Sequence, residues 1–399
     1  MHTTSHILVI NGGSSSIKFA LYATEPKLTE TITGSITRIG VAHSTLQLNF
    51  LATKENITKP IAATNYKIAV ASLLQWIKQQ QYETLIAIGH RVVHGGPTYN
   101  TPQLIDQDLI NTLQQLSSLD PEHLPEEILL IEQCYKNFPK LLQFACFDTE
   151  FYQNLPRIAQ LLPIPRKYNA RGIRRYGFHG LSYTFLMNTL HQHKIHKGRI
   201  ILAHLGSGSS LTAILNNEPI DTSMAFTPNS GIPMSTRSGD LDPGLIGYLA
   251  RTDNMNIQQF NTMIAKQSGL LGVSEVSGDM HDLLNYEQTD NRAAEAIELF
   301  CYRVRKEIGA LAASLNGLDV LVFTGGIGEN SATIRARICD NLGFLGIDLD
   351  NELNQLQKNI ISSKNSPVVV HVIRTNEEYV IATIVQQKLI EENKLCNKH

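Results

Sequence analysis

Glycine gathers in three short segments of the sequence, two of them also rich in serine, each after a run of apolar, β-forming residues. Backbone amides of glycine can approach an anion closely, and serine hydroxyls add further hydrogen-bond donors. Any one segment alone would be an ordinary turn, but three together favour a phosphate-binding site. The segments are Gly12–Ser16, Gly206–Ser210 and Gly325–Asn330.

Two familiar nucleotide-binding loops do not fit these segments. A Walker A loop requires a Gly-Lys pair, which the sequence lacks, and a Rossmann fingerprint requires a third glycine. That third position is Leu211 in one segment and Ser331 in another. Lys18 follows the first segment on a predicted strand, on the same face as Ser16, and could reach a phosphate. A solvated strand lysine is the alternative.

Several longer motifs resemble those of the acetate kinases, in order, from residue 7 to about residue 385. They are Val9–Phe19, Gly89–Gly96, Phe147–Thr149, Gly172–Gly180, Asp221–Met224, Thr236–Pro243, Phe323–Asn330 and Thr375–Glu378. The resemblance implies a duplicated actin-like, ribonuclease H-like α/β fold of two domains, with the nucleotide in the cleft between them. It also implies a homodimer that uses Mg²⁺, with Mn²⁺ as a substitute, and interconverts acetate plus ATP with acetyl phosphate plus ADP.

Phosphoryl transfer to a carboxylate needs cations more than it needs a general base. A carboxylate with a pKa of about 4–5 is already ionised at neutral pH, and it repels the γ-phosphate. The resemblance implies that Arg91 binds the carboxylate and that Arg237 and His179 stabilise the transition state. Asp148 falls at the family's catalytic aspartate, where we expect it to orient the nucleophile or the metal shell. From local sequence alone, Arg91 could be a structural salt bridge and His179 a core histidine.

The resemblance assigns further positions to substrate, metal and nucleotide. Val93 and Pro228 fall where the family packs the substrate methyl, and His123 is expected beside them. Asn11 and Glu377 fall at the Mg²⁺-linked positions, and hard oxygen ligands suit this ion. The nucleotide-binding positions are Ser14, Ser16, Lys18, His204, Leu205, Gly206, Ser207, Gly208, Asp279, Met280, His281, Gly326, Ile327, Gly328, Glu329 and Asn330.

The sequence also departs from the family pattern at a few positions. Glu122 and Leu124 replace residues near the substrate, which leaves the preference between acetate and propionate open. Ser207 and His281 replace nucleotide-binding residues, which leaves the nucleotide preference open. None of these changes removes a residue that we assign to the chemistry.

Three other functions are weighed against an acetate kinase. The first is a kinase for propionate or another short acyl chain, which acyl-acid selectivity would distinguish. The second is an actin-like or chaperone-like ATPase module, but little chain follows Glu377 to form a domain that binds clients. The third is an inactive homologue with a regulatory role, against which the retained Asn11, Arg91, Asp148 and His179 argue.

Two predicted hairpins must position these residues. Ile7–Ile10 and Ile17–Tyr22 flank the first glycine segment, and Arg199–Leu205 and Leu211–Leu215 flank the second. The two hairpins align without a gap, with agreement in both apolar and turn residues, which favours an internal duplication over chance similarity. Further along, Val320–Thr324 reads as a strand followed by a turn. Helical patterns cover residues 291–315 and 379–393, so the chain is α/β.

The length and charge of the chain agree with this reading. A chain of 399 residues is long enough for two or three domains. Its net charge of −2 gives no reason to expect nucleic-acid or membrane binding, and the five scattered cysteines suggest reduced thiols. No signal peptide is recognised at the N-terminus, so we expect a cytoplasmic protein. We expect a first domain at residues 1–148, joined by the helix at 385–399, and a nucleotide-binding domain at 149–384.

Overall fold

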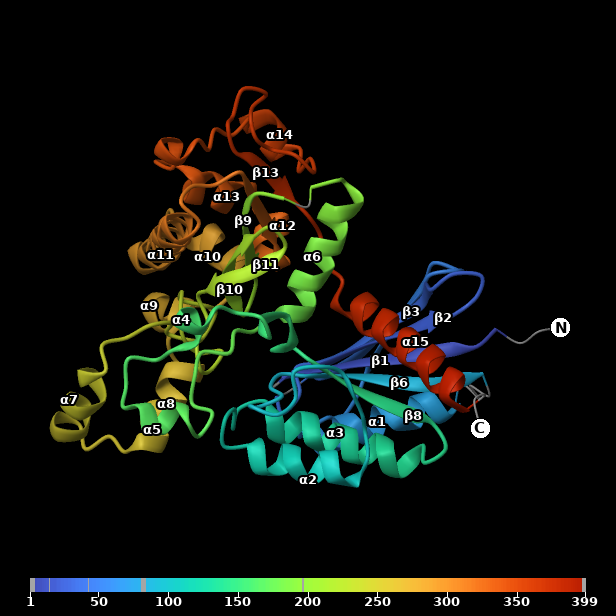
Figure 1. Cartoon of the computed structure of the whole chain (residues 1–399). Coiled ribbons are helices and arrows are strands. Elements are labelled where there is room, and N and C mark those ends of the chain that lie inside the picture. Colours follow the sequence, from blue (N-terminus) through green and yellow to red (C-terminus); the bar gives the residue numbers. More distant parts are fainter. Residues whose placement is uncertain (1–3, 14, 42, 80–83, 196, 397–399) are drawn as a thin grey trace. The chain divides into compact units, whose positions relative to one another are not determined.

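The computed structural model describes residues 4–13, 15–41, 43–79, 84–195 and 197–396 and divides the chain into two compact units (Figure 1). Unit 1 is Met1–Gln153 with Asn376–His399, and unit 2 is Asn154–Thr375. The expected divisions, after residues 148 and 384, therefore lie elsewhere. The second comes earlier because helix α15 runs unbroken over Glu377–Cys396 and packs on the sheet of unit 1.

Unit 1 is built on a mixed sheet of eight strands in the order β5-β4-β3-β2-β1-β6-β8-β7. Strands β1 and β2 form an antiparallel hairpin, whereas β1, β6 and β8 run parallel to one another. The strands are β1 (His6–Gly13), β2 (Ser16–Ala23), β3 (Thr29–Thr37), β4 (Thr45–Phe50), β5 (Glu55–Pro60), β6 (Leu85–Val92), β7 (Gln103–Leu104) and β8 (Leu142–Phe147).

Helices cover both faces of this sheet, which explains why the apolar run in β1 is continuous rather than alternating. On one face, α1 (Tyr66–Gln79) and α3 (Leu124–Asn137) share a core with Leu8 and Ile10 of β1, and α2 (Gln107–Leu116) packs on α3. Helix α15 covers the opposite face (Figure 1). It lies so close to β6 that a Cβ at Gly89 would be 2.5 Å from Ile381.

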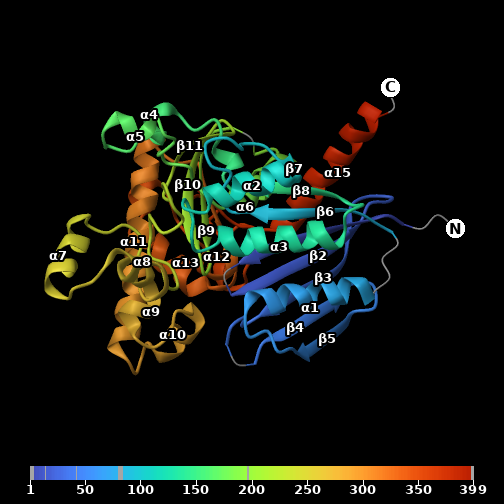
Figure 2. The same ribbon diagram turned by 90° about the horizontal axis from the view of Figure 1, so that it is seen from below.

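Unit 2 contains a five-stranded sheet in the order β11-β10-β9-β12-β13. Helix α11 packs on one side of it and α6 on the other (Figure 2). The strands are β9 (Arg199–Leu205), β10 (Ser209–Leu215), β11 (Glu218–Thr222), β12 (Val320–Thr324) and β13 (Val369–Val372). The helices are α4 (Arg157–Gln160), α5 (Arg166–Asn169), α6 (Gly180–Gln192), α7 (Gly244–Thr252), α8 (Ile257–Lys266), α9 (Gly269–Ser274), α10 (Met280–Tyr286), α11 (Asn291–Ser314), α12 (Gly325–Asn330), α13 (Ala332–Cys339) and α14 (Asn351–Gln355).

The two units repeat one strand topology. The order β3-β2-β1-β6-β8 in unit 1 matches β11-β10-β9-β12-β13 in unit 2, and each matched pair has the same parallel or antiparallel sense. The predicted duplicated α/β fold is confirmed. No described helix is long and apolar enough to cross a membrane.

The third glycine segment differs from its prediction as a turn. Gly325–Asn330 forms the short helix α12 directly after β12. Glu329 explains this, because its carboxylate accepts hydrogen bonds from the Gly325 backbone N–H (2.9 Å) and the Thr324 hydroxyl (3.0 Å). These bonds tie the carboxylate back to the end of the strand and close the chain into a helical turn.

Candidate functional site

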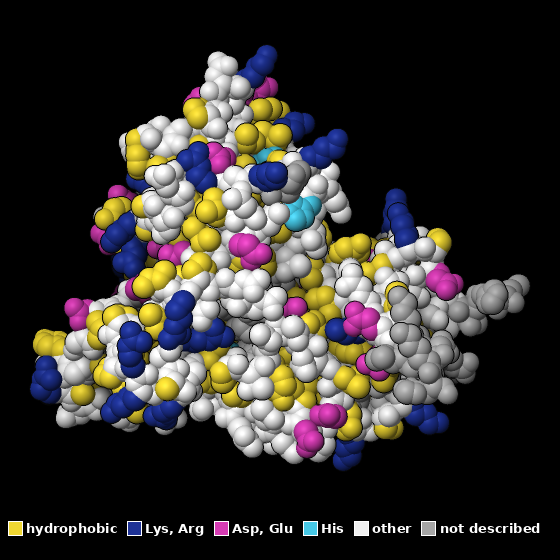
Figure 3. Space-filling model, viewed as in Figure 1, with side chains coloured by type: hydrophobic (Ala, Val, Ile, Leu, Met, Phe, Trp, Pro, Cys, Tyr) yellow, Lys and Arg dark blue, Asp and Glu magenta, His cyan; other side chains and the backbone are white. Residues whose placement is uncertain are grey.

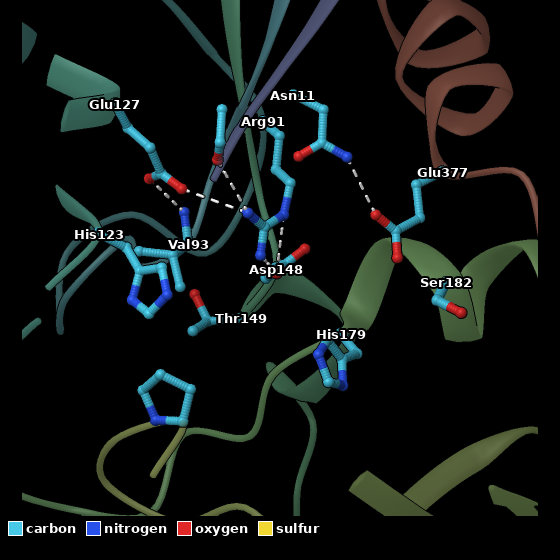
Figure 4. A network of polar contacts seen from close by, with 12 residues as sticks. Asn11, Arg91, Val93, His123, Glu127, Asp148, Thr149, His179, Ser182 and Glu377 are labelled. Carbon is cyan, nitrogen blue, oxygen red and sulfur yellow. Dashed lines mark hydrogen bonds and ion pairs between the residues drawn. The ribbon is translucent and has the colours of Figure 1, made fainter. Parts of the chain in front are cut away.

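Arg91 of unit 1 lies at the centre of a buried ion-pair cluster (Figure 4). Arg91 is on β6 and Asp148 directly follows the parallel neighbour β8, so both side chains lie at the same edge of the sheet. The Asp148 Oδ2 atom accepts from Arg91 Nε at 3.1 Å and from Nη2 at 2.5 Å. Arg91 Nη1 lies 3.3 Å from Glu127 Oε1. The salt bridge that local sequence allowed is therefore present, and it fixes the plane of the guanidinium group.

Glu127 was missed by the sequence analysis. It belongs to α3, is 2% exposed, and accepts a 2.8 Å hydrogen bond from the Val93 backbone N–H through Oε2. Burial raises the pKa of the Glu127 carboxyl to about 8, against the opposing effect of Arg91. A signal was available in the sequence, because this acid occupies the apolar stripe of the helix between Leu124 and Ile128.

We expect Glu127→Gln to change how stability depends on pH. The pKa of Glu127 is about 8 in the folded protein and about 4.3 in the unfolded chain. Between these two pH values the folded protein binds more protons than the unfolded chain does. Wild-type stability should therefore fall from about pH 5 to pH 8, and the variant should lose this part of the fall. Urea unfolding midpoints at pH 5.5, 7 and 8.5 measure the difference; parallel curves for the two proteins would contradict the prediction.

A second group of oxygen atoms lies beside this cluster in unit 1 (Figure 4). The Asn11 side-chain amide donates to Glu377 Oε2 and to Glu378 Oε1, each at 3.2 Å. Partial burial, with Asp148 nearby, raises the pKa of Glu377 to about 7. Asp148 Oδ1 is buried and accepts no hydrogen bond from the described residues. A surplus of carboxylate oxygens with one atom left unsatisfied is a donor set that fits a hard divalent cation.

This donor set is an open site rather than a closed cage. Among the described residues, no group of three or more His, Cys, Asp or Glu side chains is arranged to hold a metal ion. Mg²⁺ keeps several waters and is usually held by one or two carboxylates together with substrate phosphates, so an open set suits it. Lys18 of β2 pairs with Asn11 of β1 in the hairpin, which places its exposed side chain on the same face.

The other predicted residues of unit 1 have more ordinary surroundings. His123 precedes α3, and its Nδ1 lies 3.1 Å from Oδ1 of the buried Asp120. Val93 is buried, and its backbone amide is held by Glu127 as described above. Ser16 begins β2 and is partly exposed, whereas the predicted residue Ser14 lies outside the described residues.

In unit 2, His179 and Arg237 converge over the backbone of the second glycine segment. A Cβ at Gly208 would lie 3.2 Å from His179 Nε2 and 3.2 Å from Arg237 Nη2. His179 precedes α6 with a left-handed backbone (φ 60°), and its ring stacks on His204 with the ring centres 4.4 Å apart. Arg237 Nη1 donates to the Pro228 carbonyl at 2.8 Å. Two cationic or donor groups thus meet above Gly208, which has no side chain of its own.

We expect Gly208→Ala to reduce turnover. The added Cβ would lie 3.2 Å from both His179 Nε2 and Arg237 Nη2, so these groups would have to shift, and small shifts of positioned groups lower the rate. Steady-state kcat measures the loss. Gly343→Ala is a matched control, because no described atom lies within 4 Å of its Cβ position. Equal kcat in the two variants would contradict the assignment of His179 and Arg237 to the active site.

The second and third glycine segments lie side by side. A Cβ at Gly206 would be 3.7 Å from the Gly326 backbone nitrogen, and no described atom lies within 4 Å of the Cβ position at Gly326. The Glu329 side chain does not point into this open space, because its carboxylate also accepts a hydrogen bond from the Thr375 N–H (3.2 Å). The fully buried Arg335, another missed residue, donates to the Gly328 and Glu329 carbonyls at 2.9 Å and so anchors α12.

The last predicted nucleotide segment, Asp279–His281, opens α10. The Asp279 carboxylate caps this helix by accepting from the His281 backbone N–H at 2.8 Å. Met280 is buried in the core of unit 2, whereas His281 is exposed. The remaining predicted positions of unit 2 lie on β9 or on the turn that follows it (His204, Leu205, Ser207) or within α12 (Ile327, Asn330).

Comparison with known proteins gives one family over most of the chain. A model of the acetokinase family matches residues 6–383. An acetate kinase of Rhodopseudomonas palustris (strain TIE-1) is 41% identical over 94% of this chain and 96% of its own length. A propionate kinase of Citrobacter freundii is 40% identical over 97% of each chain. The crystal structure of a propionate kinase from Francisella tularensis superposes with a TM-score of 0.88 at 37% identity, covering 95% of this chain and 98% of that one.

Proposed function

The chain belongs to the acetokinase family, and from this premise we propose that it transfers the γ-phosphoryl group of ATP to acetate, giving acetyl phosphate and ADP, and catalyses the reverse reaction. The observation that carries the proposal is the convergence of His179 Nε2 and Arg237 Nη2 over Gly208. Donors placed in this way can stabilise the negative charge that develops on a phosphoryl group in transfer.

The proposed reaction is a direct in-line transfer. A carboxylate oxygen of acetate forms a bond to the γ-phosphorus while the bond from that phosphorus to the bridging oxygen of ADP breaks. Arg91, held flat by Asp148 and Glu127, binds the carboxylate and offsets its repulsion from the phosphate. No proton has to be removed from an acid that is already ionised, so Asp148 positions Arg91 and the nucleophile rather than acting as a base.

The nucleotide is proposed to lie along the glycine segments of unit 2. Gly206 and Gly326 present adjacent backbone with open space at Gly326, which suits a phosphate chain. When bound beside Asn11 and Glu377, Mg²⁺ supplies positive charge to the phosphate oxygens. In-line transfer requires the carboxylate bound by unit 1 to meet the phosphoryl group bound by unit 2.

Acetate is the proposed substrate, and propionate is the alternative. Relatives of both names match this chain at nearly equal identity. A pocket that packs a methyl group distinguishes one methylene by only about 1–3 kcal/mol, so both acids are expected to react at different rates.

A trapping assay tests the proposal. Purified protein is incubated with ATP, Mg²⁺ and hydroxylamine, and each acyl phosphate is detected as its hydroxamate. Acetate, propionate and butyrate are compared, with GTP in place of ATP in a parallel series. Acetate should give the highest kcat/KM. An equal or higher value for propionate would make propionate the substrate, and no hydroxamate from any acid would refute the kinase proposal.

We also propose a cytoplasmic homodimer, with α7 at its interface. All of α7 is described, and none of its residues is buried. Tyr248 on this helix is 57% exposed, and Leu241 and Ile257 beside it are 44% and 62% exposed. Figure 3 shows hydrophobic side chains on the surface over α7. An exposed apolar patch of this kind is typical of a subunit interface.

Tyr248→Asp should therefore convert the dimer to a monomer in light scattering, because the new charge would have to be buried in the interface. Ile68→Asp provides a control in unit 1, where Ile68 is 39% exposed. A wild-type protein that is already monomeric, or a Tyr248→Asp variant that remains dimeric, would refute the interface.

A further inference from the structure

A buried relay of hydroxyl groups lies behind His179 in unit 2. Ser210 Oγ is 2.9 Å from His179 Nδ1 and 2.5 Å from the Tyr183 hydroxyl oxygen. Ser210 and Tyr183 are both fully buried, at 0% exposed. Ser210 ends the second glycine segment, but neither residue was given a role of its own from the sequence. Ser210 contacts the ring at Nδ1, the nitrogen other than Nε2, and Tyr183 contacts Ser210.

Local structure accounts for this arrangement. Tyr183 lies one helical turn after His179, and its backbone N–H donates to the His179 carbonyl at 3.1 Å, so the two side chains share one side of α6. Ser210 of β10 is directly opposite His204 of β9, so their side chains project from the same face of the sheet. The stacking of His204 on His179 completes the enclosure of the ring.

The chemistry of the two hydroxyls sets the direction of the hydrogen bonds. A phenol is a stronger donor and a weaker acceptor than an aliphatic alcohol, so Tyr183 donates to Ser210 Oγ. The Ser210 hydroxyl is then oriented to donate to His179 Nδ1. A neutral imidazole that accepts at Nδ1 carries its proton on Nε2. Nε2 is the atom that converges with Arg237 over Gly208.

We propose that Tyr183 is a positioning residue that acts through Ser210 to hold His179 as an Nε2–H donor toward the transferred phosphoryl group. The inference rests on the proposed kinase reaction. Without the phenol, the Ser210 hydroxyl can turn away, and His179 can adopt the tautomer that offers a lone pair, rather than a proton, to an anionic oxygen. The relay therefore acts on the transition state more than on the bound substrates.

The test compares single and double variants in steady-state kinetics. Tyr183→Phe keeps the ring and removes only the hydroxyl, and it should lower kcat by about 10-fold to 100-fold, as the loss of a group that orients a histidine does. KM for acetate and for ATP should change by less than about twofold. Tyr176→Phe is the matched control, because the buried Tyr176 hydroxyl donates to the Gly172 carbonyl at 2.6 Å in the same unit. The control should retain wild-type kcat.

A double-mutant cycle separates positioning from a purely structural role. In the His179→Ala background, Tyr183→Phe should change kcat by less than about twofold, because the group it orients is gone. A full effect of Tyr183→Phe in that background, or no effect in the wild type, would overturn the inference.

The relay can also be tested without activity. Imidazole ¹⁵N chemical shifts, with the His179 signals assigned by their loss in His179→Ala, should show an Nε2–H tautomer in the wild type and a mixture in Tyr183→Phe. Identical shifts in the two proteins would overturn the relay. If the wild type forms no acyl phosphate, the kinase proposal is refuted. The chemical shifts would then still show whether Tyr183 sets the tautomer of His179.

Discussion

Arg237→Ala is expected to lower kcat by about 100-fold to 1000-fold, the loss seen when one preorganised donor to a developing anion is removed. The structural reason is that Arg237 Nη2 points with His179 Nε2 to one place over Gly208, where no side chain competes for space. Binding of acetate should change little, because the interaction strengthens only as charge moves onto the phosphoryl oxygens. Steady-state kinetics with acetate and ATP varied separately measure both effects.

Two further variants sharpen this result. Arg166→Ala removes an exposed arginine from α5 of the same unit and should leave kcat unchanged. Arg237→Lys keeps the positive charge but loses the planar guanidinium group, in which Nη1 donates to the Pro228 carbonyl while Nη2 lies over Gly208. This variant should therefore have a kcat between those of Arg237→Ala and the wild type. Near-normal kcat in Arg237→Ala would remove this residue from the mechanism.

Arg91→Ala is expected to raise the KM for acetate by about 10-fold to 100-fold, because charge-assisted hydrogen bonds to a carboxylate are worth about 1.5–3 kcal/mol. The same change should also destabilise unit 1. The Asp148 carboxylate, which is 1% exposed, would lose its cation, and breaking a buried ion pair costs about 3–5 kcal/mol. Acetate titrations and urea unfolding measure the two effects separately.

A compensating change should separate substrate binding from stability. In the Arg91→Ala, Asp148→Asn double variant, the carboxylate left without its cation becomes a neutral amide, so part of the lost stability should return. The KM for acetate should stay high, since no cation has been restored. An acetate KM that recovers along with the stability would show that Arg91 acts only through the fold, and an unchanged KM in Arg91→Ala would contradict its binding role.

Short-range features of the sequence, together with the resemblance to the acetate kinases, were enough to predict the duplicated fold and to name candidate site residues. The hairpins around Gly12 and Gly206 were recognisable because strand periodicity and glycine-rich turns are set by residues close together in the chain. Their equivalence predicted a duplication, and the matching strand orders of the two units confirm it. His179 and Arg237 were named from local motifs, and the structure brings both to Gly208.

Other features depended on contacts between residues far apart in the chain. The sequence placed the end of the second domain after residue 384, but α15 begins at Glu377 because its apolar face packs on β1 and β6. Residues 325–330 were expected to form a turn but form a helix, in which Glu329 accepts hydrogen bonds from Thr324 at the end of β12 and from Thr375.

The sequence by itself determined which cations and glycines this protein has for phosphoryl chemistry, since those are matters of residue type and local spacing. Only the tertiary structure decided what holds them in place. Glu127 meets Arg91, and Tyr183 meets Ser210, because strand order and helix packing bring together residues that no local pattern connects. A buried side chain must find its hydrogen-bond partner wherever the folded chain supplies one, and that choice is made by the fold as a whole.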